Sequence, residues 1–90
     1  MEARELLGWN LRRLRVERGL SQRRLAVAAE IDHAYLGRVE RAKVNVTLKF
    51  IEATARALDV PIAELFAVPK AGTAKPERLP AGRPRGSVSS

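Results

Sequence analysis

Few side chains in this sequence are suited to catalysis. There is no cysteine, which excludes thiolate metal sites and cysteine nucleophiles, and the single histidine, His33, cannot build a metal site alone. No glycine-rich phosphate loop occurs, and no nucleophile is recognisably paired with His33. What remains is the chemistry of 17 lysines and arginines, which outnumber 10 acids and give a formal net charge of +7. This excess favours binding to an anionic partner, and we expect neither an enzyme nor a cofactor.

The length of 90 residues fits one domain with a shallow core. The apolar runs are much shorter than the roughly 18 residues that a membrane span needs. The N-terminal residues lack the pattern of a signal peptide. We therefore expect a cytoplasmic protein without a membrane partner.

The composition changes sharply after Phe66. Four of the five prolines and three of the six glycines follow it, together with five basic residues against one acid. We predict a folded domain over residues 1–66 and a flexible basic tail over residues 67–90. Residues 82–86, Gly-Arg-Pro-Arg-Gly, resemble the Gly-Arg-Pro centre of minor-groove AT-hooks. A merely solvated basic tail is the alternative interpretation.

Apolar residues recur at helical spacing through the first 66 residues. Leucines between Leu7 and Leu14 predict a first helix that Gly19 ends. Ser21 is placed as the N-cap of a second helix, which ends at Glu30-Ile31. The apolar face of this second helix is narrow and made mostly of small residues, which suits close packing between helices.

Asp32 is the predicted N-cap of a third helix that runs to about Arg41, and Thr47 that of a fourth. The expected core face of the fourth helix consists of Leu48, Ile51, Ala55 and Leu58. A short fifth helix follows Pro61. No segment alternates with the period of a strand, so the sequence predicts an all-α domain of five helices.

The second and third predicted helices are short, joined by a tight turn, and the third is poor in apolar residues. This is the helix-turn-helix arrangement. Over residues 6–66 the sequence resembles the Cro/CI-type (lambda-repressor-like, XRE) DNA-binding domains. The resemblance is carried by Leu11-Arg12-Arg13-Leu14-Arg15, Gly19-Leu20-Ser21-Gln22, Leu25-Ala26, Ile31-Asp32, Tyr35-Leu36, Val39-Glu40-Arg41, Asn45, Thr47-Leu48, Ala57-Leu58 and Leu65-Phe66. The small size is similar to that of restriction–modification controller proteins and compact phage repressors.

The resemblance implies a regulator that binds double-stranded DNA with its third helix, about residues 33–41, in the major groove. The base-reading positions that it implies are Asp32, His33, Ala34, Tyr35, Gly37 and Arg38. Arg38 has the chemistry to bond guanine O6 and N7 together. For Tyr35 two interpretations stay open, namely covering the edge of the core and touching a phosphate.

Phosphate contacts are expected on either side of the recognition helix. They come from Gln22 and Arg23 at the start of the second helix, and from Arg41, Lys43 and Asn45 after the third. In the family pattern Arg15 and Glu40 form an ion pair between the first and third helices, and we expect it here; DNA contact by Arg15 is the alternative.

The sequence departs from the family pattern at three positions. Glu30 and Ala42 stand where the family usually has glycine, and Val46 stands where many members have proline. A non-glycine residue in the left-handed region costs about 1 kcal/mol. The turns at Glu30 and Ala42 are therefore either strained or shaped differently, and the loop at Val46 is open in the same way.

Members of this family usually dimerise, which implies a homodimer on a palindromic operator. The expected interface is an exposed apolar patch of Phe50, Thr54, Ile62, Leu65 and Phe66. The alternative is that these residues close the core, and Trp9 stays open between core and interface. A second hypothesis is an antitoxin, whose main partner is a toxin and whose DNA binding is secondary.

Overall fold

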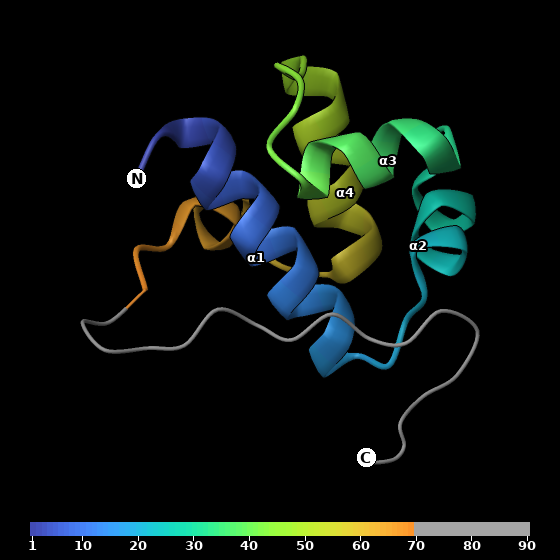
Figure 1. Cartoon of the computed structure of the whole chain (residues 1–90). Helices are drawn as coiled ribbons and strands as arrows, with labels where there is room; N and C mark the ends of the chain where they lie inside the picture. Colours follow the sequence, from blue (N-terminus) through green and yellow to red (C-terminus); the bar gives the residue numbers. More distant parts are fainter. Residues whose placement is uncertain (70–90) are drawn as a thin grey trace, which may run out of the picture.

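The computed structural model describes residues 1–69, which contain four α-helices and one short 3₁₀ helix (Figure 1). The elements are α1 (Ala3–Glu17), α2 (Gln22–Ala29), α3 (His33–Glu40), α4 (Leu48–Leu58) and η1 (Ile62–Phe66). No strand occurs among these residues, which confirms the all-α class, and the fifth predicted helix is the 3₁₀ helix. The expected tail from residue 70 onward, with its Gly-Arg-Pro segment at 82–86, lies outside the described residues.

Three helices begin at side-chain caps that the sequence predicted. Ser21, Asp32 and Thr47 each accept a hydrogen bond from the backbone N–H three residues further on, at 3.1, 2.8 and 3.1 Å. Each bond satisfies one of the N–H groups that a helix start leaves without a partner. The starts of α2, α3 and α4 are therefore fixed by local sequence.

Three helix-end turns use residues other than glycine in the left-handed region. Glu30, Ala42 and Asp59 all have φ of 59°. At Glu30 this conformation lets the following N–H, that of Ile31, bond the carbonyl of Ala26 at 2.9 Å. The C-terminal hydrogen bonds of these helices therefore form as they do with glycine, and the cost is backbone strain at the left-handed residue.

The core lies between all five elements. α1 packs against α3 and η1, whereas α2 packs against α3 and α4 (Figure 1). The buried apolar side chains are Leu7, Leu11, Leu14, Leu25, Ala26, Leu36, Val39, Phe50, Ile51, Ala55, Leu58 and Leu65. Trp9 is half-buried.

The buried face of α4 differs from the predicted one. Leu48 is 77% exposed, while Phe50 is 6% and Thr54 0% exposed. Leu48 stands about a quarter of a turn from the centre of the buried face, because successive residues are about 100° apart on a helix. The Phe50 ring meets the ring of Tyr35 edge-on, with centroids 5.4 Å apart. The expectations of a buried Leu48 and an exposed Phe50 are therefore wrong.

A buried asparagine joins the first element to the last. Asn10 Nδ2 donates to the carbonyls of Leu6, Leu65 and Ala67 at 3.0, 3.1 and 2.9 Å. Its Oδ1 accepts from Arg13 Nε at 3.1 Å. This amide gives η1 and the residue after it a fixed place on α1.

α1 also approaches the C-terminal end of α3 very closely at Gly8. A Cβ there would lie 2.7 Å from the Glu40 carbonyl oxygen and 2.9 Å from that of Val39. Those are backbone atoms, so they cannot move aside like a flexible side chain. Residues four and seven positions further along α1, Arg12 and Arg15, continue the same stripe toward α3.

We expect Gly8→Ala to lower the free energy of unfolding by about 2 kcal/mol, because the added methyl overpacks a backbone contact. Gly37→Ala is the matched control in another helix. Its Cβ would meet only side-chain ends, the nearest being Arg41 Nη1 at 3.4 Å, so stability should be unchanged or higher. Urea unfolding of both variants provides the measurement, and equal losses would contradict this explanation.

Ala42→Gly should raise the unfolding free energy by about 0.5 kcal/mol, since relief of left-handed strain exceeds the added entropy of glycine. The converse change, Gly19→Ala, should lower it by about 1 kcal/mol. Gly19 has φ of 66° and no atom within 4 Å of an added Cβ, so strain alone acts there. The thermal midpoints of the two variants should shift in opposite directions; a shift of both in one direction would refute the strain argument.

Candidate nucleic-acid interface

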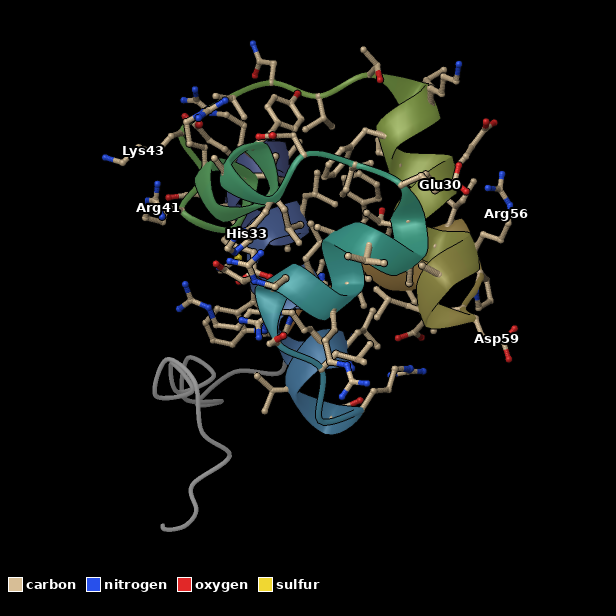
Figure 2. The ribbon with its side chains drawn as sticks, turned by 90° about the vertical axis from the view of Figure 1, so that its right-hand side faces the viewer. Glu30, His33, Arg41, Lys43, Arg56 and Asp59 are labelled. Carbon is tan, nitrogen blue, oxygen red and sulfur yellow. The ribbon has the colours of Figure 1, made fainter. Side chains whose placement is uncertain are left out.

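The surface around α3 is polar and basic. His33, Ala34 and Arg38 of α3 are exposed, whereas Leu36 and Val39 point into the core. Figure 2 shows His33, Arg41 and Lys43 on one side of the molecule and Arg56 and Asp59 on the other. The helix thus presents its non-apolar side outward, beside the basic residues that follow it.

Of the six predicted base-reading residues, four are exposed, one is half-buried and one is buried. Asp32 is exposed, but its carboxylate accepts the Tyr35 backbone N–H. Gly37 is the buried one, and its expected outward position is wrong. The ends of Gln22 and Arg41 lie over it, at 3.6 and 3.4 Å from where a Cβ would stand. These two side chains therefore cover Gly37 from outside, at a distance that would still admit a Cβ.

Tyr35 connects the recognition helix with the loop that follows it. Its hydroxyl donates to the Asn45 carbonyl at 3.0 Å, and its ring packs against Phe50. The Arg38 guanidinium lies over the ring, 5.6 Å from its centroid. Of the two interpretations left open, this geometry is that of a residue at the edge of the core, with a cation–π contact on its outer side.

The predicted phosphate-contacting residues fall into two groups. Arg23, Arg41, Lys43 and Asn45 are exposed. Gln22 is half-buried, and its Nε2 donates to Glu40 Oε1 at 3.1 Å. One of the five is thus already engaged inside the protein through its amide nitrogen.

Beneath this surface the structure brings Arg15 and Glu40 together in a bidentate ion pair. Arg15 Nε and Nη2 lie 2.7 and 2.9 Å from the two oxygens of Glu40. The Glu40 side chain is 0% exposed and that of Arg15 is 5% exposed. Arg15 Nη1 also donates to the Leu20 carbonyl at 2.9 Å. These bonds engage the Arg15 guanidinium within the protein, as expected of a structural ion pair.

A second arginine reaches the same carboxylate. Arg12 Nε lies 3.6 Å from Glu40 Oε1, and only 10% of the Arg12 side chain is exposed. Arg12 is not among the predicted site residues, because helical periodicity places it on the polar side of α1. Its spacing from Gly8 and Arg15 was the signal that could have identified it.

The expected dimer patch is largely internal. Thr54 and Leu65 are 0% exposed and Phe50 is 6% exposed, because α4 and η1 close the core with them. Ile62 is 46% exposed, and Phe66 is half-buried. The prediction of a five-residue exposed patch is thus wrong for three of its members.

Within residues 1–69 no group of three or more potential ligands could hold a metal ion. Over the same residues no helix combines the length and the apolarity needed to cross a membrane.

The family match and the similar proteins agree with each other. Residues 6–67 match the helix-turn-helix domain family. The chain is 38% identical over 69 residues to a hypothetical transcription factor of Neisseria meningitidis, covering 77% of this chain and 65% of that protein. It is 37% identical over 66 residues to control protein C.SmaI of Serratia marcescens, covering 73% of this chain and 79% of that one.

A solved structure agrees with these sequence matches. The restriction–modification controller protein C.AhdI of Aeromonas hydrophila superposes with a TM-score of 0.68 and is 44% identical. The match covers 70% of this chain and 96% of that chain. By their names, these relatives are a hypothetical transcription factor, a control protein and a restriction–modification controller protein. The chain belongs to the helix-turn-helix family of DNA-binding transcription regulators, of the Cro/CI (XRE) type.

Proposed function

We propose that this protein is a sequence-specific transcription regulator that binds a palindromic operator as a homodimer. The observation that carries the proposal is the exposed polar side of α3, held from below by the buried ion pair of Arg15 and Glu40. A helix held in this way can enter the major groove without rearrangement. The protein would act in the cytoplasm, at the nucleoid.

Base contacts are assigned to the exposed residues of α3. Arg38 would bond a guanine, His33 would bond a neighbouring base edge, and Ala34 would offer a methyl contact to thymine. Gln22, Arg23, Arg41, Lys43 and Asn45 would contact phosphates, which position the protein without reading sequence, with Gln22 using its N–H at the start of α2. Gly37 has no direct part in this assignment, because side chains cover it.

The homodimer is proposed because one helix-turn-helix domain is too small to contact a whole operator. One helix-turn-helix unit contacts about half a site, and two recognition helices must stand about 34 Å apart to reach successive major grooves. Ile62 and the outer part of Phe66 are the apolar residues of the expected patch that reach the surface. A toxin partner is the alternative, and it would appear as a second protein chain co-purifying with this one.

Selection of bound sequences from random duplex DNA, at a stated salt concentration, tests the function. A palindromic consensus bound by two copies of the chain is the expected result, because two-fold protein symmetry requires it. The mass of the complex on the selected duplex gives the stoichiometry. Binding without any sequence preference would reject the proposed function.

Arg38→Ala and Lys43→Ala separate the two kinds of contact. We expect Arg38→Ala to relax the preference at one base pair, losing about 1–3 kcal/mol of discrimination there. Lys43→Ala should weaken binding to all duplexes alike and reduce the salt slope by about 1. Affinities of both variants for the selected duplex and for single-base-pair changes provide the measurement. Uniform losses from both variants would contradict the assignment.

A further inference from the structure

The buried charges around Glu40 do not balance. Both oxygens of this carboxylate accept hydrogen bonds from Arg15, and Oε1 also accepts one from Gln22 Nε2 at 3.1 Å. Arg12 approaches the same Oε1 at 3.6 Å, which is beyond hydrogen-bond distance, and its Nε is buried without a hydrogen-bond partner. Among residues 1–69 the ion pairs of Arg12 include no other acid. Two guanidiniums therefore share one carboxylate and leave a surplus positive charge.

Burial of Arg12 Nε without a hydrogen-bond partner is unfavourable for the free domain. Removing a charged group from water is unfavourable unless a partner replaces the water, and an unsatisfied donor adds to that cost. A neutral side chain of similar length would fill the same space beside α3. Residues that break the rules of folding in this way occur mostly at functional sites.

The position of Arg12 indicates what could balance the charge. Its neighbours at Glu40 include Gln22, the first residue of α2, where first-turn N–H groups and the helix dipole favour an anion. The ends of Gln22 and Arg41 both lie beside Gly37, at 3.6 and 3.4 Å from where a Cβ would stand, so the start of α2 and the end of α3 are close together. Arg12 is joined to this corner through Glu40 Oε1, which Gln22 Nε2 bonds at 3.1 Å, and one tenth of the Arg12 side chain is exposed.

We propose that Arg12 completes a phosphate-binding corner with Gln22 and Arg41, and that a DNA backbone phosphate supplies the missing negative charge. This inference rests on the proposed DNA-binding function and adds a residue to it. The phosphate would turn an unfavourable buried charge into a paired one only when DNA is bound. Arg12 would therefore contribute affinity for DNA and no preference among bases.

Arg12→Gln tests this, because glutamine removes the charge and keeps a donor for Glu40. We expect the thermal midpoint of the free protein to be unchanged or higher. On the duplex selected by the wild-type protein, Kd should rise about tenfold, with the same factor for its single-base-pair changes. The log–log slope of affinity against salt should fall in magnitude by about 0.9, the value for one phosphate contact. Arg12→Lys should restore most of the slope.

Arg56→Gln is the matched control, since it changes the net charge equally and Arg56 is exposed on the opposite side from Arg41 and Lys43 (Figure 2). Its salt slope should equal that of the wild-type protein. A lower thermal midpoint for Arg12→Gln with an unchanged slope would show a structural role and overturn the inference alone. Absence of DNA binding by the wild-type protein would instead reject the proposed function, and this inference with it.

Discussion

The Glu40 carboxylate is the point on which the arrangement of the first three helices depends. It is fully buried and accepts hydrogen bonds from Arg15 of α1 and Gln22 of α2, while Glu40 is itself the last residue of α3. Short helices such as α2 and α3 cannot hold their mutual angle by apolar burial alone, because each offers few core residues. Loss of one partner of a buried ion pair is strongly destabilising, since the other charge is left without compensation. The direction in which α3 presents its outer side is therefore set from inside the protein.

Much of the fold could be predicted because its signals are local. The caps at Ser21, Asp32 and Thr47 act within one turn of helix, and each begins its helix where the sequence predicts. At Glu30 and Ala42 the family's glycines left two possibilities, a strained left-handed residue or a turn of another shape, and the structure has the left-handed residue at both. The spacing of apolar residues identified the core side of α1 correctly from Leu7 to Leu14.

The rest depends on contacts between elements, which periodicity does not specify. A helical repeat fixes which residues share a side but not how wide the buried side becomes, so Leu48 and Phe50 exchanged their expected places. Burial of polar groups was missed for a related reason. Arg12 and Asn10 look like surface residues in a helical pattern, and only the close approach of α3 and η1 buries them. The outward site residues were identified by position, whereas Gly37 is covered by neighbours from two elements.

The bonds of Asn10 to Leu65 and Ala67 have a consequence for how the domain forms during synthesis. They join residues that are 55 and 57 positions apart, so α1 cannot complete its packing early. During synthesis these bonds cannot form until the chain has been made as far as Ala67, and closing so long a loop costs entropy before its contacts form. Contacts between α1 and α3 do not need η1. The packing of η1 against α1 is therefore the step that waits for the last residues of the domain.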